Sequence, residues 1–186
     1  MKSRYYIFVC IIALGWAGCK PYSPSPYKGM PKEYVLGYEE IYGHCYDSIP
    51  SAVVALDLYS DGLTLDQNHR IQGTGYNLYI SDIFVPDSLL EEGAYKSIPQ
   101  DSLSAFNFQL SSFRFLPGRD YEGLPHGIYV LKIEEDQIAS IQVLDSGSFV
   151  YRNDSLLFTM YYKNAYGSRA KYTYSFPGPL IPWQKK

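Results

Sequence analysis

The chain has 186 residues and is mildly acidic, with 16 Lys and Arg against 19 Asp and Glu and a net charge of −3. Its basic residues form no cluster, so the composition argues against nucleic acid and against a polybasic membrane patch. A chain of this length can bury a substantial hydrophobic core within one domain.

The first 18 residues have the features of a signal peptide. Lys2 and Arg4 give a positive start, and ten uncharged residues, Tyr5–Leu14, follow. About 20 apolar residues are needed to cross a bilayer, so this run is too short to span one and fits the core of a signal sequence. We therefore expect residues 1–18 to be removed from the mature protein.

Cys19 follows two small residues, Ala17 and Gly18, as cleavage by a signal peptidase requires. The arrangement resembles a bacterial lipoprotein signal, in which the cysteine is acylated, although Trp16 stands where that family prefers Leu. The resemblance implies lipidation at Cys19 and attachment to a lipid bilayer. The alternative is an ordinary secretory signal followed by a cysteine of no special role.

Residues 19–33 are rich in proline, which disfavours helix and ladder pairing and predicts an extended tether. Cleavage before Cys19 would remove two basic residues and no acidic one, leaving a net charge of −5. Beside the acylated cysteine only Cys45 would remain, so no internal disulfide is expected. The resemblance implies the cell envelope. Because residues 20–22 lack the acidic stretch of surface-exported lipoproteins, the periplasmic face of the outer membrane is favoured over the cell surface.

From residue 34 onward, apolar and polar residues alternate with a period of two. The runs Tyr76–Ser81, Phe106–Leu110 and Lys171–Phe176 each place apolar side chains on one face and mostly polar ones on the other, which is typical of antiparallel strands with one buried face. We predict one all-β domain over 34–186, an antiparallel β-sandwich of roughly 8–10 strands, with a closed lipocalin-like β-barrel as the alternative. The residues expected deepest in the core are Phe108, Leu131, Phe158 and Tyr174.

Three local features are predicted within this domain. The apolar phase slips at Ser111–Ser112, which indicates a β-bulge. Pro86–Gly93 is the segment most compatible with a single helical turn. Asp61–Gly62 favours a hairpin turn over a calcium loop, since the surrounding acids lack the spacing of an EF-hand.

Three segments beginning at Leu90, Leu124 and Leu144 share the pattern Leu-x-x-Gly-x-aromatic. We predict that the glycine supplies a turn conformation and that the aromatic residue enters the next strand. Their unequal spacing excludes a solenoid repeat. With the runs LPHGIYVLKI, LDSGSFVYR and YTYSFPGPL, the chain resembles small Bacteroidales-type lipoproteins built as β-sandwiches. The resemblance implies the fold and carries over no catalytic residue.

The sequence shows no catalytic or metal motif. His44, His69 and His126 are scattered, without the spacing of a zinc site, and Cys45 is interpreted as a small buried residue. Adjacent acids such as Glu39–Glu40 most simply solvate turns. We therefore expect no catalytic residue, metal or cofactor, and a binding or assembly module. The alternatives are a hydrolase whose site is assembled from dispersed residues, and a barrel that carries a small apolar ligand.

Tyrosine is abundant, with 20 residues in the chain. Tyr79 and Tyr161 fall on the outward phase of their strands, and Trp183 lies in a proline-flanked tail. Outward aromatic residues can form a platform for a glycan or a protein, or can simply pair across strands. We predict that these three residues form a binding face.

The dipeptide Asp-Ser precedes an aliphatic residue at four places, similar to the O-glycosylation acceptor motif of Bacteroidales-type exported proteins. The resemblance implies modification at those serines that are exposed. Asp-Ser also favours turns, which is the alternative explanation for the repeated dipeptide. The four serines are Ser48, Ser88, Ser102 and Ser155.

Overall fold

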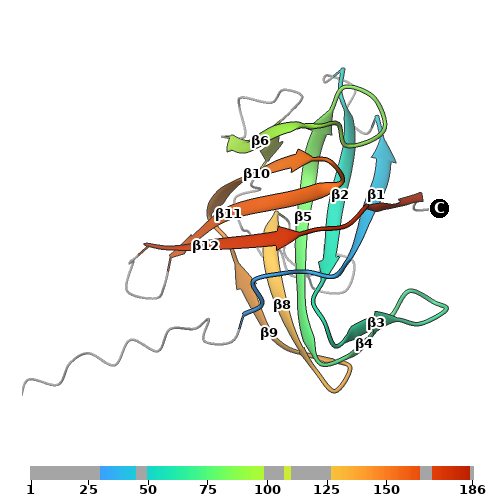
Figure 1. Cartoon of the computed structure of the whole chain (residues 1–186), viewed down its shortest axis with the longest axis vertical. Helices are drawn as coiled ribbons and strands as arrows, with labels where there is room; N and C mark the ends of the chain where they lie inside the picture. The colour runs from blue at the N-terminus through green and yellow to red at the C-terminus, as the bar shows by residue number, and fades with distance from the viewer. Residues whose placement is uncertain (1–29, 45–49, 99–106, 110–126, 164–168, 185–186) are drawn as a thin grey trace, which may run out of the picture. The chain divides into compact units, whose positions relative to one another are not determined.

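Thirteen β-strands and no helix make up the part of the chain that the computed structural model describes, namely residues 30–44, 50–98, 107–109, 127–163 and 169–184 (Figure 1). The strands are β1 (Leu36–Gly43), β2 (Ala52–Tyr59), β3 (Leu63–Leu65), β4 (Ile71–Gly73), β5 (Gly75–Val85), β6 (Gly93–Ile98), β7 (Asn107–Gln109), β8 (Ile128–Glu134), β9 (Gln137–Val143), β10 (Ser146–Arg152), β11 (Ser155–Lys163), β12 (Arg169–Phe176) and β13 (Ile181–Gln184). The all-β prediction is confirmed. The strands outnumber the expected 8–10 because β3, β4, β7 and β13 have only three or four residues, too few to show an alternating pattern. The predicted signal segment and most of the predicted tether lie outside the described residues.

The strands form two layers (Figure 1). β1, β2, β5, β8 and β9 lie in the first layer, and β6, β10, β11 and β12 in the second. The short strand β7 pairs with both β5 and β6 and so links the layers. Neighbouring strands are antiparallel except for β1–β13 and β6–β7. The described strands do not close on themselves, since the path ends at β12 on one side and β13 on the other. The antiparallel β-sandwich is confirmed, and the closed-barrel alternative is wrong.

The main hydrophobic core fills the space between the two layers. Leu58 of β2 and Phe158 and Phe176 of the second layer are all buried, and Leu58 and Phe176 both lie next to Gly37 of β1. A Cβ atom on Gly37 of β1 would lie 2.7 Å from the Phe176 ring, so the layers approach too closely there for any larger residue. As predicted, Phe158 and Tyr174 belong to the buried core.

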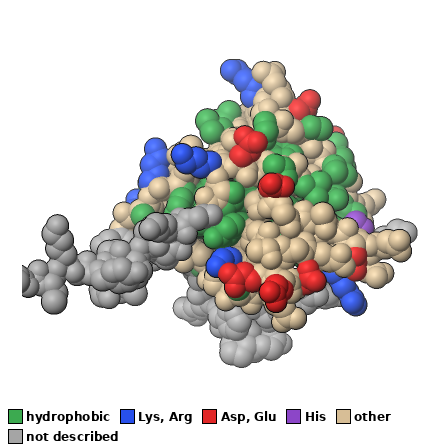
Figure 2. All heavy atoms as spheres, turned by 60° about the horizontal axis from the view of Figure 1, so that its bottom comes forward, with side chains coloured by type: hydrophobic (Ala, Val, Ile, Leu, Met, Phe, Trp, Pro, Cys, Tyr) green, Lys and Arg blue, Asp and Glu red, His purple; other side chains and the backbone are tan. Residues whose placement is uncertain are grey.

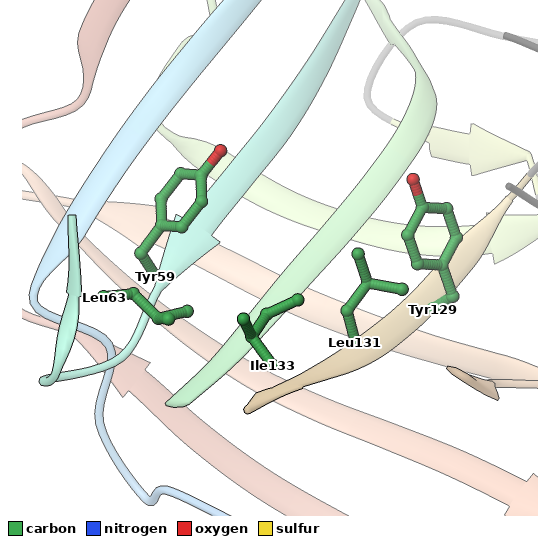
Figure 3. Packing of buried hydrophobic residues seen from close by; sticks show 5 residues of the cluster. All are labelled: Tyr59, Leu63, Tyr129, Leu131 and Ile133. Carbon is green, nitrogen blue, oxygen red and sulfur yellow. The ribbon is translucent and has the colours of Figure 1, made fainter. Parts of the chain in front are cut away.

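A second apolar cluster lies on the opposite face of the first layer (Figure 3). The hairpin β3–β4 covers this face, with Leu65 and Ile71 packed against the cluster. Leu131 is buried as predicted, but in this second cluster and not between the layers. The side chain of Phe108 lies outside the description, as does the bulge predicted at Ser111–Ser112. The five buried members are Tyr59, Leu63, Tyr129, Leu131 and Ile133.

The turn at Asp61–Gly62 and the segment Pro86–Gly93 differ from the structures predicted for them. Asp61–Gly62 is a turn, with Gly62 at φ +87°, but it joins β2 to β3, which do not pair. The hairpin is the following one, β3–β4. The segment Pro86–Gly93 forms bends and no helical turn, because the Leu90 amide donates its hydrogen bond to the Glu39 carboxylate.

The glycines of the Leu-x-x-Gly-x-aromatic pattern have two different roles. Only Gly127 has the positive φ, +99°, that the turn explanation requires. Gly147 is needed for close approach, since a Cβ there would lie 2.0 Å from the sulfur of Met160. The aromatic positions fill the core: Tyr95 and Phe149 are cross-strand partners whose ring centroids are 4.6 Å apart. The shared pattern therefore reflects packing more than turn chemistry.

Exposed apolar side chains are distributed over the surface. On the side drawn in Figure 2, hydrophobic groups are separated by charged and polar ones. Val35, Ile138 and Leu157 are among those exposed, and they come from different strands or connections. Val150 and Leu157 are exposed register partners on β10 and β11. Scattered exposed apolar residues and one such pair are common in folded proteins, so they mark no docking surface by themselves. Among the described residues, no helix is long and apolar enough to span a membrane.

Candidate functional site

Acidic and aromatic side chains gather on the face of the first layer that the β3–β4 hairpin partly covers. They occupy alternate positions of neighbouring strands, which places them on one side of the sheet. The strand register aligns Asp57 with Tyr79, and Tyr79 with Tyr129. At the sheet edge it pairs Glu40 with Trp183. We call this surface the tyrosine–carboxylate face: Glu40, Tyr42, Asp57, Tyr59, Asn77, Tyr79 and Trp183.

Glu40 is the centre of this face. Its side chain is only 4% exposed, and its Oε2 accepts hydrogen bonds from the hydroxyl groups of Tyr42, at 2.7 Å, and Tyr79, at 3.0 Å. The two hydroxyl oxygens are 3.0 Å apart. Burial raises the pKa of both tyrosines, so their hydroxyl groups remain protonated and act as donors. The other oxygen of Glu40, Oε1, accepts no hydrogen bond from any described residue.

Asp57 is the acceptor of a second set of side-chain hydrogen bonds on this face. The Tyr59 hydroxyl and the Asn77 amide nitrogen donate to its two carboxylate oxygens. The same amide nitrogen of Asn77 lies 3.2 Å from the carbonyl oxygen of Leu58. Tyr59 and Asn77 are both buried, which fixes the orientation of the Asp57 carboxylate. Burial, followed by the charge of Asp57, raises the pKa of Tyr59.

A row of aromatic rings borders Glu40 on the side of β13. Trp183 stacks on His69 with ring centroids 4.6 Å apart and planes 10° from parallel. His69 meets the edge of Tyr38, which in turn contacts Tyr59. The β3–β4 hairpin therefore contributes directly to the site through its connecting loop.

The loop that carries His69 is built around Asp66. Its Oδ1 accepts hydrogen bonds from the backbone amides of Asn68, at 2.7 Å, and Arg70, at 2.9 Å. These bonds lower the pKa of Asp66, with the one from Arg70 the larger cause. The backbone of His69 has φ +59°, in the left-handed region that residues other than glycine adopt at a cost in conformational energy. The loop thus presents the imidazole in a fixed position against Trp183.

The structure brings together two of the three residues predicted to form a binding face. Tyr79 and Trp183 both lie on the tyrosine–carboxylate face: the Tyr79 hydroxyl donates to Glu40, and Trp183 is the register partner of Glu40 in β13. Both are half-buried, and Tyr79 stacks on Tyr129 at 5.2 Å. Tyr161 is in β11 of the second layer, where the Arg169 guanidinium covers its ring at 4.2 Å. The prediction of one face shared by all three residues is therefore wrong.

The expectation that Glu39–Glu40 solvate a turn is also wrong. Both residues lie within β1, and both are buried, on opposite faces of the strand. Glu39 points toward the core side, where its carboxylate accepts the hydrogen bond of the Leu90 amide. Burial raises the pKa of Glu39, with that hydrogen bond opposing the shift.

The remaining residues singled out in the sequence are dispersed. Ser88 is exposed on the connection between β5 and β6, and Ser155 is half-buried at the start of β11. His44 is exposed at the end of β1. Across the described ranges, no group of three or more His, Cys, Asp or Glu side chains is placed to hold a metal ion. Cys19, Cys45, Ser48, Ser102 and His126 lie outside the description.

Comparisons with protein-family models, with curated proteins and with solved structures find no match to this chain.

Proposed function

We propose that this chain is a lipid-anchored, non-catalytic envelope protein whose β domain binds a glycan or protein ligand through the tyrosine–carboxylate face. One observation carries the proposal: Tyr79, which donates a hydrogen bond to the buried carboxylate of Glu40, and Trp183, the register partner of Glu40, come from distant parts of the sequence to one face. Binding surfaces are enriched in tyrosine and tryptophan, and a fixed carboxylate adds a directional acceptor. The signal-like residues 1–18 and Cys19 support attachment to the outer membrane, on its periplasmic face, with residues 19–33 as the tether.

The proposal is tested by measuring ligand binding to the full-length chain in detergent, on glycan arrays and against purified envelope proteins. Tyr42 is 40% exposed at the rim of the face, so Tyr42→Ala should remove contact area without opening the core. We expect this variant to lose binding by about tenfold or more, as truncation of a central aromatic contact does. Tyr161→Ala is the matched control on the second layer and should bind normally. Normal binding by Tyr42→Ala and loss in Tyr161→Ala would contradict the proposal.

A second candidate function, a hydrolase, is favoured by the relation of Glu40 to Asp57. Glu40 pairs in register with Ala55, two residues before Asp57, so the two carboxylates are diagonal neighbours on one face. Such neighbours are about 7–8 Å apart, a separation that suits a general acid and base acting through water. Hydrolysis of chromogenic glycosides that is lost in both Glu40→Gln and Asp57→Asn would replace the binding role with this one.

A further inference from the structure

We propose that Glu40 is the recognition point for an alkylammonium group, specifically the side chain of a lysine presented by a protein partner. This inference rests on the proposed function, because it names the ligand chemistry of the same tyrosine–carboxylate face. It follows from the charge, the hydrogen bonds and the ring surfaces around one carboxylate.

Among the described residues, no cation forms an ion pair with the buried carboxylate of Glu40. The ion pairs among the described residues are Lys132–Glu134 and Arg169–Asp145, neither of which involves this face. Tyr42 and Tyr79 donate to Glu40, but both are neutral donors. A buried carboxylate is costly unless it is paired and hydrogen-bonded, so the site as built is complementary to a positive charge.

The hydrogen-bonding pattern around the Glu40 carboxylate also favours a cation as the ligand. The two hydroxyl groups are within hydrogen-bond reach of Oε2 and of each other, while Oε1 accepts no hydrogen bond from the described residues. An incoming group therefore finds an acceptor oxygen. The hydroxyls of Tyr42 and Tyr79 are already committed as donors, so they favour a ligand that brings its own N–H groups. An ammonium group brings three.

The neighbouring rings favour the same ligand. Trp183 is the register partner of Glu40, and Tyr38 occupies the position two residues before it on the same face. Aromatic faces carry negative electrostatic potential and attract ammonium groups, with tryptophan the strongest. The methylene groups of an alkylammonium chain can also pack on ring surfaces while the charged end reaches the carboxylate.

The number of oxygen ligands and the burial of Glu40 favour a lysine over a metal ion or a sugar. Calcium takes roughly six to eight oxygen ligands, whereas Glu40 offers one open oxygen. With 4% of its surface exposed, Glu40 can be reached by a slim chain more readily than by a broad pyranose ring. A lysine side chain is slim and carries its charge at the end of four methylene groups.

The test uses Nα-acetyl-lysine methylamide as the probe and its uncharged Nε-acetyl form as the matched control ligand. The chain has two tryptophans, and Trp16 lies in the segment expected to be cleaved, so the processed protein in non-ionic detergent has Trp183 as its single tryptophan reporter. Where the segment is retained, Trp16→Phe gives the same single reporter. We expect the charged probe to change the Trp183 fluorescence with a dissociation constant on the order of 1 mM, typical of one small contact group. The affinity should fall severalfold between about 50 mM and 500 mM salt, because the attraction is electrostatic.

Glu40→Gln is the decisive variant, since its amide oxygen can still accept both tyrosine hydrogen bonds while the charge is removed. We expect at least about a tenfold loss of affinity for the probe, with an unchanged near-ultraviolet circular dichroism spectrum. Equal binding of the charged and Nε-acetyl probes, no binding of the charged probe at about 20 mM, or an affinity independent of salt would each overturn the inference.

Glucosamine and N-acetylglucosamine form a second pair of probes. Stronger binding of either sugar than of the lysine probe would overturn the lysine assignment in favour of a glycan. If ligands bind in a way that Tyr42→Ala abolishes and Glu40→Gln does not, the cation inference fails and the proposed face remains. If Tyr42→Ala changes no binding while Tyr161→Ala does, the proposed function itself fails.

Discussion

The hydroxyl group of Tyr79 in β5 donates a hydrogen bond to Oε2 of Glu40 in β1 over 3.0 Å, although strand β2 lies between their strands. The register partner of Glu40 in β2 is Ala55, which is fully buried. A methyl group at this position leaves room for the Tyr79 side chain to cross the strand. The Tyr79–Glu40 hydrogen bond therefore connects β5 to β1 across the small side chain of Ala55 in β2.

Replacing Tyr79 with Phe should remove this connection while keeping the ring stacked on Tyr129. Among the described residues, Glu40 would then retain the Tyr42 hydroxyl as its single side-chain donor. Hydrogen bonds to charged groups contribute about 1.5–3 kcal/mol, so we expect the free energy of unfolding to fall by about that amount. Urea denaturation followed by circular dichroism measures the change.

Tyr161→Phe is the control for Tyr79→Phe, because the Tyr161 hydroxyl makes no hydrogen bond with a described residue and the Arg169 contact involves only the ring. Its unfolding free energy should stay within about 0.5 kcal/mol of the wild type, as for most surface substitutions. Equal effects of the two substitutions would show that the Tyr79–Glu40 bond is energetically unimportant.

The adjacent residues Leu157 and Phe158 of β11 test the assignment of the core. Phe158 is completely buried and its ring lies 5.4 Å from that of Phe149, whereas Leu157 is 55% exposed. Phe158→Ala should lower the free energy of unfolding by about 3–5 kcal/mol through lost burial and a residual cavity. Leu157→Ala should change it by less than about 1 kcal/mol. Similar losses in both variants would mean that the register of β11 is wrong.

The alternation of apolar and polar residues along each strand made the sandwich predictable, because successive side chains of a strand point to opposite faces of the sheet. Phe158 and Tyr174 could be placed in the core for this reason. Leu131 was correctly expected to be buried, but its location on the hairpin-covered face was not predictable. That cover comes from β3 and β4, whose three residues each give no periodic signal.

The tyrosine–carboxylate face could be predicted only in part, since it depends on which strands become neighbours. The local signal was present: Tyr38, Glu40 and Tyr42 share one phase of β1, and Asp57 and Tyr59 share one phase of β2. Nothing local shows that these phases face the same side of one sheet. The charge of Glu40 suggested an exposed turn, whereas hydrogen bonds from Tyr42 and the distant Tyr79 allow it to be buried.

Replacing Cys19 with Ala tests the proposed anchor. If Cys19 is acylated, the wild type should partition with membranes and into the detergent phase, and Cys19→Ala should accumulate unprocessed or leave the membrane fraction. Cys45→Ala is the matched control and should partition as the wild type does. Mass spectrometry of the amino terminus gives the modification directly. A mature wild type with an unmodified amino terminus and no membrane association would contradict the anchor.

Glu39 provides a prediction about pH, because its buried carboxyl has a pKa raised above its ordinary value. Burial disfavours the charged form in the folded state, so the stability associated with this group is fully present below the pKa of the unfolded chain. It is lost as the pH rises through the higher pKa of the folded state.

Glu39→Gln keeps an oxygen for the Leu90 amide and cannot ionise. The urea midpoint of this variant should therefore exceed that of the wild type at neutral pH, and the difference should shrink toward acidic pH. Glu91→Gln is the control, since Glu91 is exposed and follows Leu90 on the connection between β5 and β6. We expect this variant to show the same dependence of the urea midpoint on pH as the wild type. A wild-type profile that Glu39→Gln does not flatten would mean that the ionised carboxylate is tolerated at this site.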